Sequence, residues 1–236
     1  MIAEVPNTVS KLCAIELPAV SIPQSALTFR GFCQWACSDA FPEKTKICLI
    51  GKEIIVDMNP EKADSHVSVK QAIYRTMSQL IEEQDMGLFF PDGLLIVHEA
   101  AELSNMPDAS LISRESIRDG RIKRIPDEFG DDCSALEGSA DWVLEIISQS
   151  SVQKDTVLLR QKYFRAGVVE YWIVDARKTD QTDLQILVRG KRGFVAQPRV
   201  GGWSNSPLFG RRFSLQRRTY EGDFWRFELL VASSAR

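Results

Sequence analysis

The stretch that decides the fold is DWVLEIISQSSVQKDTVLLRQKYFRAGVVEYWIVDAR, residues 141–177. It begins and ends with apolar runs rich in branched and aromatic residues, which are typical of buried strands. Between them, SQSSVQKD predicts a turn and a helix cap, and TVLLRQKYFRA predicts a helix that ends at Gly167. This order predicts a β-α-β unit whose two strands are parallel neighbours joined by a right-handed crossover.

One carboxylate, Glu145, lies inside the first of these strands. A carboxylate in a buried strand loses several kcal/mol of solvation unless it is paired, hydrogen-bonded or bound to a cation. Glu145 therefore needs a partner. An arginine near the strand end is one explanation, and a bound metal ion is the other.

The flanking sequence extends the α/β pattern. Upstream of residue 141, the sequence predicts a hairpin around residues 51–52. It then predicts a helix that is capped by Asp64 or Ser65 and stopped by Gly87. A strand at 108–113 and a long loop over 114–132 follow. Hairpins are expected around 190–193 and 221–223. We therefore expect an α/β fold with a mixed central sheet flanked by helices and antiparallel hairpins at its edges. The expected units are an N-terminal extension (1–40, with one short helix), a main domain (41–200) and a C-terminal hairpin extension (201–236).

Composition limits the function. With 236 residues and 44% hydrophobic content, the chain can bury a sizeable core. A net charge of -3 excludes a strongly basic protein that coats nucleic acid. Any contact with nucleic acid must therefore be local. The arginine pairs 211–212 and 217–218, which are interleaved with aromatic residues, could bind phosphate groups and stack on bases. A hairpin with one basic face and one aromatic face explains the same alternation more simply.

Cysteine usage and hydropathy predict the compartment. The five cysteines are odd in number and scattered, a pattern typical of reduced thiols rather than disulfides. The first twenty residues lack the apolar core of a signal peptide, and no later run approaches the ~20 apolar residues of a membrane span. We expect a cytoplasmic protein without a membrane segment.

A second carboxylate precedes Glu145 in the chain. Asp108 follows Pro107 and opens an apolar strand, whereas Asp92 is followed by Gly93 in a pattern typical of a turn. An Asp and a Glu from neighbouring strands can converge on one Mg²⁺. A lysine that holds the attacking water would complete a site for phosphodiester hydrolysis.

The chain resembles a known family over about residues 45–190. PDASLIS (107–113), DWVLEIIS (141–148) and the D-x(7)-Y-x(3)-GV-x-EYW-x-VD run at 155–175 are similar to the Uma family of restriction-endonuclease-like proteins, a branch of the PD-(D/E)xK nuclease superfamily. The resemblance implies Asp108 and Glu145 as metal ligands and Glu61 as an accessory acid near the metal. It also implies Mg²⁺ or Mn²⁺ as cofactor and DNA as substrate.

The signature lysine departs from the family pattern. The two positions where relatives carry it are Ile147 and Leu159 here, so Lys154 is the first candidate and Lys162 the second. An ordinary solvated lysine is the alternative for both. We therefore expect a metal-dependent endonuclease, and a homodimer would suit it because a duplex has two strands to cut. The alternative is a catalytically silent nuclease fold that binds DNA or a protein partner.

Overall fold

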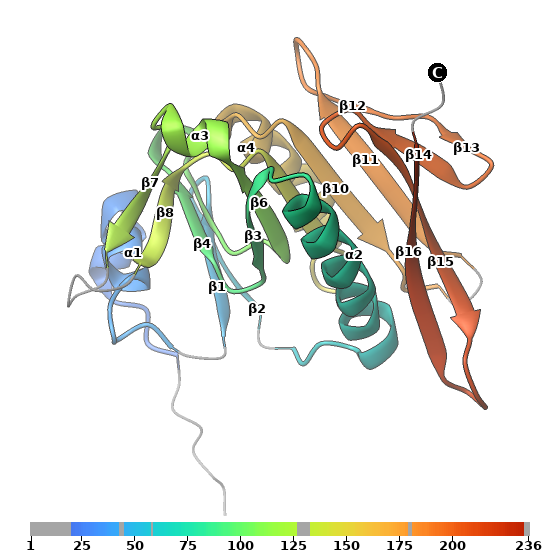
Figure 1. The fold of residues 1–236 in the computed structure, drawn as a ribbon. Helices are drawn as coiled ribbons and strands as arrows, with labels where there is room; N and C mark the ends of the chain where they lie inside the picture. The colour runs from blue at the N-terminus through green and yellow to red at the C-terminus, as the bar shows by residue number, and fades with distance from the viewer. Residues whose placement is uncertain (1–19, 43–44, 58, 127–132, 179–180, 234–236) are drawn as a thin grey trace, which may run out of the picture.

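The structure, a computed structural model, describes residues 20–42, 45–57, 59–126, 133–178 and 181–233 (Figure 1). Residues 1–19 of the expected extension lie outside this part of the chain. The rest of the extension forms η1 (Gln24–Leu27) and the predicted helix α1 (Phe29–Ala36). Phe32 and Trp35 of α1 pack against Ile47 and Leu49, so this segment shares a core with the strand that follows it.

The central sheet contains both strands of the predicted β-α-β unit. β9 and β10 are parallel neighbours, as expected, and the remaining pairs of this sheet are antiparallel. The hairpin of β11 and β12 forms one edge and β3 forms the other. In spatial order the strands are β12 (Phe194–Ala196), β11 (Asp183–Arg189), β10 (Glu170–Asp175), β9 (Trp142–Ile146), β6 (Ala109–Ser113) and β3 (Gly87–Pro91).

A second mixed sheet, the N-terminal sheet, begins with the predicted hairpin around Gly51. That hairpin joins β1 to β2, which lies at the sheet edge. β4 and β8 pair in parallel, and the other pairs are antiparallel. The order is β2 (Glu53–Asp57), β1 (Lys46–Ile50), β5 (Leu103–Asn105), β4 (Leu95–His98), β8 (Cys133–Gly138) and β7 (Ile122–Pro126).

The last residues form the antiparallel C-terminal sheet. It contains β13 (Arg199–Val200), β14 (Trp203–Ser206), β15 (Arg211–Thr219) and β16 (Trp225–Ser233). β15 and β16 are the arms of the hairpin predicted near residues 221–223, and they pair along their whole length. Phe213 and Phe227 of these strands belong to the same apolar core as residues of the central sheet. Whether 201–236 is a separate unit stays a prediction.

The remaining helices pack on the sheets. α2 packs against both β3 and β16, between the central and C-terminal sheets (Figure 1). Two helices begin with a wider π-helical turn: η2 leads into α2 and η4 leads into α4. Their bounds are η2 (Ala63–Ser68), α2 (Val69–Glu83), η3 (Glu99–Ala101), α3 (Arg114–Arg118), η4 (Lys154–Leu158) and α4 (Leu159–Ala166). Within the described ranges, no helix combines the length and apolar character needed to cross a membrane.

The side chains of β9 point alternately to the two faces of the central sheet, and each face is covered by a different layer of the core. Trp142, Leu144 and Ile146 join the layer that contains α2 and the C-terminal sheet. Val143 joins the layer that contains α4 and the N-terminal sheet. Because successive side chains of a strand point to opposite faces, Glu145 shares the face of Val143. The charge at Glu145 is thus enclosed between two sheets and a helix.

Three local predictions were wrong. The segment from Arg114, predicted as a loop, forms α3 and β7, because Ser113 caps the helix by accepting from Ser116 N; residues 127–132 of that loop lie outside the described residues. Neither Asp64 nor Ser65 caps the long helix, since its π turn begins after Lys62 without a side-chain cap. The helix also ends at Glu83, before Gly87, which begins β3 instead.

Candidate metal site and catalytic pocket

The pairing of β6 with β9 brings the two predicted carboxylates to one end of the central sheet. Ala109 lies opposite Leu144 in the antiparallel register. Asp108, one residue before β6, therefore lies beside the end of β9 that carries Glu145. A pocket of about 900 Å³ opens at this end, and its lining includes Asp108 and Glu145 together with Glu61, His66 and Lys154.

Asp108 is buried and surrounded by hydrogen-bond donors and positive charge. Its Oδ2 accepts a 2.7 Å hydrogen bond from the backbone N–H of Ile146, and its Oδ1 lies 3.2 Å from Lys46 Nζ and 3.1 Å from Lys70 Nζ. Burial alone would raise the pKa of Asp108. The two ammonium groups, His66 and the Ile146 N–H outweigh burial and lower this pKa below its ordinary value. Asp108 is therefore a carboxylate at neutral pH.

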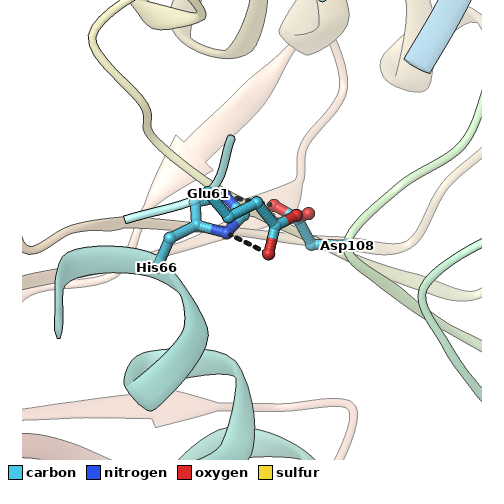
Figure 2. A group of neighbouring side chains, drawn as sticks. All are labelled: Glu61, His66 and Asp108. Atoms are coloured by element: carbon cyan, nitrogen blue, oxygen red, sulfur yellow. Dashed lines mark ion pairs between the residues drawn. The ribbon is translucent and has the colours of Figure 1, made fainter. Parts of the chain in front are cut away.

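Glu61 and His66 complete a three-residue group with Asp108 (Figure 2). One ligand atom from each residue lies within 4.8 Å of the others, which suits a single metal ion. His66 Nδ1 is 3.1 Å from Glu61 Oε2, and Nε2 is 3.6 Å from Asp108 Oδ2. These side chains come from the loop after β2, the π turn η2 and the residue just before β6.

The imidazole of His66 is oriented by a backbone carbonyl. Nε2 lies 3.1 Å from the carbonyl oxygen of Ile146, a distance at which an Nε2–H donates a hydrogen bond. In that tautomer Nδ1 carries a lone pair, and this buried atom has no hydrogen-bond partner among the described residues. A carbonyl that accepts from one ring nitrogen, and so fixes the tautomer, is the usual arrangement for a metal-binding histidine. The lone pair faces Glu61, and a cation between the two would satisfy both.

Two lysines also occupy this cluster. Lys70 Nζ lies 2.7 Å from Glu61 and 2.5 Å from Asp92, in addition to its contact with Asp108. Lys46 Nζ lies 3.1 Å from Glu61 and 3.4 Å from Asp92. The Lys70 side chain is 7% exposed, whereas that of Lys46 is 42% exposed, so Lys46 has the greater freedom to move away.

The charges in this cluster also set the pKa of Glu61. Partial burial would raise it, but the Lys70 hydrogen bond and the charges of His66, Lys70 and Lys46 lower the pKa of Glu61 to about 2. For Lys70, the loss of solvation opposes the charged form, yet Asp108, Asp92 and Glu61 raise its pKa above the ordinary value. Glu61 is therefore a carboxylate and Lys70 an ammonium group at neutral pH.

Glu145 has the partners that its burial requires. Its Oε1 accepts hydrogen bonds from Asn105 Nδ2 at 2.9 Å and from the Tyr163 hydroxyl at 2.6 Å, while Lys154 Nζ lies 3.7 Å from Oε2. Burial raises the pKa of Glu145 to about 8 against the opposing charge of Lys154, and Asp155 adds to the rise. A negative charge on Glu145 is therefore costly unless a cation lies close to it.

Lys154, the first candidate lysine, lies where it was expected. It belongs to the π turn η4, lines the pocket, and pairs at 2.9 Å with Asp155, whose other carboxylate oxygen accepts from Ser151. Asp155 thus positions Lys154, and it does not act as a side-chain cap of the helix. The nearby carboxylates of Glu145 and Asp155 raise the pKa of Lys154 despite its burial. Lys154 therefore stays an ammonium group.

Lys162, the second candidate, lies elsewhere. Its Nζ pairs with Glu102 at 2.9 Å, and it does not line the pocket. The structure therefore brings together Asp108, Glu145, Glu61 and Lys154 from the predicted set and leaves Lys162 outside.

Sequence reasoning missed four residues near the pocket: Lys46, Lys70, Asn105 and Tyr163. The sequence did point to Tyr163, because it is one of the residues of the 155–175 run that resembles the family. For Lys70 the indication was weaker: it directly follows Val69 on the apolar edge of the predicted helix. No sequence feature pointed to Asn105 or Lys46, because only the pairing of distant strands brings them to the site.

The fold is similar to that of solved structures. One of them is described as a "putative nuclease belonging to DUF820 from Anabaena variabilis", with a TM-score of 0.56 and 17% sequence identity over 77% of this chain and 90% of that chain. At this identity the similarity supports the restriction-endonuclease-like fold alone. No curated protein matches the chain.

A family match covers most of the sequence. The family Uma2, described as "Putative restriction endonuclease", matches residues 29–220. This range includes all residues that line the pocket. Together, the sequence match and the shared fold show that the chain belongs to the Uma2 family of restriction-endonuclease-like proteins.

Proposed function

We propose that this protein is a metal-dependent endonuclease that hydrolyses DNA phosphodiester bonds. The observation that carries the proposal is the cluster of Glu61, His66 and Asp108, whose ligand atoms lie within 4.8 Å of one another. The same pocket contains Glu145 and Lys154. Membership of a family described as "Putative restriction endonuclease" supports DNA as the substrate.

The cluster fits a divalent ion such as Mg²⁺ or Mn²⁺. Asp108 and Glu61 offer carboxylate oxygens, His66 offers the buried lone pair of Nδ1, and Glu145 would be the further ligand. Carboxylates suit both ions, and the imidazole favours Mn²⁺. When bound, such an ion lowers the pKa of a coordinated water and balances negative charge on the phosphate.

The side chains have distinct proposed roles. Lys154 donates to the attacking water and keeps it oriented toward phosphorus, while Asp155 holds the ammonium group in place from 2.9 Å. The hydrogen bonds from Asn105 and Tyr163 fix the Glu145 carboxylate. Such fixed positions lower the barrier because little reorganisation remains for the reaction itself.

A second function has an observation in its favour. Lys46 and Lys70 already lie 2.5 to 3.4 Å from the carboxylates of Glu61, Asp92 and Asp108. These ammonium groups balance most of the charge that would otherwise attract a metal. The alternative is therefore a catalytically silent nuclease fold that binds DNA or a protein partner without a metal.

Cleavage of supercoiled plasmid tests the proposal. The purified protein is incubated with Mg²⁺, with Mn²⁺ and with chelator, beside Glu145→Gln and Lys154→Met. We expect metal-dependent nicking that falls at least ~100-fold in both variants, because one loses a proposed metal ligand and the other loses the donor that orients the water. Loss of nicking in Lys162→Met, with activity kept in Lys154→Met, would move the lysine role to Lys162.

A thermal melt separates the two functions. A nuclease site should raise the melting temperature in Mg²⁺ or Mn²⁺, and Asp108→Asn should abolish the shift. No shift with either ion, together with no nicking, supports the silent module. Homodimerisation stays a prediction, and light scattering of the protein with and without DNA measures it.

A further inference from the structure

The end of the β15–β16 hairpin has an unusual distribution of charge. We call residues 217–226 the distal ribbon; they comprise the ends of both strands and the turn between them. Arg218 and Arg226 lie directly opposite each other in the antiparallel register, and both are exposed. Like charges at directly opposed positions of a sheet destabilise it. The repulsion between the two arginines therefore destabilises the hairpin, and a bound ligand of negative charge would relieve it.

The local contacts of the two arginines only partly balance this charge. Arg218 Nη2 donates to Gln216 Oε1 at 3.1 Å and lies 3.4 Å from Glu228 Oε2. The Arg226 guanidinium lies 5.6 Å from the ring centroid of Tyr220, and no carboxylate pairs with it within the described part of the chain. One acid thus serves two neighbouring guanidinium groups on one face.

The distal ribbon lies beside the candidate catalytic pocket. Arg217 Nη1 is within 3.4 Å of the carbonyl oxygen of Lys178, and the preceding residue, Arg177, lines the pocket. β16 also contacts η2, the turn that carries His66. Figure 1 shows the β15–β16 hairpin running along α2, with the turn between the two strands extending beyond the start of the helix. A polymer held by the ribbon would therefore reach the pocket mouth.

Exposed aromatic rings flank the arginine pair. Tyr220 is 68% exposed and Phe224 is 72% exposed, although a turn needs neither ring for its own stability. The turn also carries Glu221 and Asp223, which repel phosphate groups. Phosphate contact therefore belongs to the strand face with the arginines, not to the tip of the turn.

We propose that the distal ribbon is a DNA-binding arm, in which Arg218 and Arg226 contact the phosphate backbone of duplex DNA and direct it across the pocket. A two-stranded ribbon matches the dimensions of a DNA groove, and arginine contacts to phosphate fix the register of a protein on the duplex. The choice of DNA rests on the proposed nuclease function. The arm supplies the local basic contact that an acidic protein needs to bind DNA.

Fluorescence anisotropy with a labelled duplex of about 30 base pairs tests the arm. The full chain is titrated in chelator, at several salt concentrations, so that cleavage does not interfere. The double variant Arg218→Ala/Arg226→Ala should bind at least ~10-fold more weakly, and its salt slope should fall by about two, because each lost phosphate contact removes about one released counterion. Arg218→Lys/Arg226→Lys should keep most of the affinity.

The matched control removes two exposed positive charges from the other hairpin. Lys191→Ala/Arg192→Ala lowers the net charge equally and should change the dissociation constant less than ~2-fold. Glu221→Gln/Asp223→Asn should tighten binding. Circular dichroism melts identify misfolding, and the arginine double variant should melt no lower than wild type because a repulsive pair is removed.

The outcomes separate this inference from the nuclease proposal. A loss of affinity in the arginine variant beyond that of the control supports the arm, even if no variant ever nicks plasmid. Equal losses in both double variants, or no duplex binding by wild type, would overturn the arm. Plasmid nicking by wild type would then still stand as support for the nuclease.

Discussion

The buried carboxylate of Glu170 offers a test of how firmly the C-terminal sheet is joined to the core. Glu170 belongs to β10, yet it accepts hydrogen bonds from Ser206 Oγ at 2.5 Å and from the backbone N–H of Leu208 at 3.2 Å. The indole N–H of Trp172 donates to the same carboxylate at 2.6 Å. One side chain thus links the central sheet to the start of the C-terminal sheet.

Glu170→Ala removes the acceptor for all three donors. Ser206 can rotate, but the Trp172 indole and the Leu208 N–H are fixed. A buried donor left without an acceptor costs ~1–3 kcal/mol, so the two together predict a loss of ~2–6 kcal/mol in the free energy of unfolding. That is a large share of the ~5–15 kcal/mol typical of a folded domain.

The loss should depend on pH. Burial raises the pKa of Glu170 above its ordinary value of 4.5, despite the hydrogen bonds from Ser206, Trp172 and Leu208. The folded protein therefore holds this proton more tightly than the unfolded chain does. Its stabilising effect is complete below about pH 4.5 and declines as the pH rises through the folded pKa. The difference between wild type and Glu170→Ala should accordingly shrink as the pH rises above about 4.5 and through the folded pKa.

Urea unfolding followed by circular dichroism measures this difference. Glu228→Ala is the control, because this carboxylate of the C-terminal sheet pairs with Arg218 at the surface, with its side chain 39% exposed. Such a surface pair contributes less than ~1 kcal/mol. Equal losses in the two variants, or parallel stability profiles across pH, would refute the reasoning.

Three further predictions concern the pocket and its helix. Tyr163→Phe removes the hydroxyl that donates to Glu145 and should lower the free energy of unfolding by ~1–3 kcal/mol, measured in urea. Lys70→Met removes a cation that lowers the pKa of Asp108, so the variant should lose less stability than wild type as the pH falls below about 4. The same variant should bind Mn²⁺ more tightly in calorimetry, because a competing positive charge is gone. Gly167→Ala should cost ~1–2 kcal/mol in thermal melts, because Gly167 ends α4 with a φ of 105° that a residue with a Cβ adopts only under strain.

Regular patterns made much of the fold predictable. The apolar runs around Glu145 and Trp172 gave the parallel pair β9 and β10, and the left-handed Gly167 ended the helix between them as expected. Short polar segments were harder. The segment from Arg114 contains a helix and a strand because Ser113 caps one and pairing with β8 stabilises the other, and tertiary pairing leaves little trace in local composition.

The candidate site was predictable only in part. Asp108 and Glu145 lie on paired strands, so the sequence could place them together. Lys70 was not foreseen, because a lysine on the buried edge of a helix looks like an ordinary surface residue until its three carboxylate partners are known.

The π-helical turns at the starts of both pocket helices affect how related sequences should be aligned. A π turn holds about one residue more than an α-helical turn, so every side chain after it is rotated by about 100° relative to a continuous α-helix. Lys154 lies in such a turn, and His66 lies in the other. In a relative whose helix is α-helical throughout, the side chain with the same place in the pocket would be one residue away in an alignment without gaps. A comparison of Lys154 with the signature lysine of relatives should therefore allow a shift of one residue at this turn.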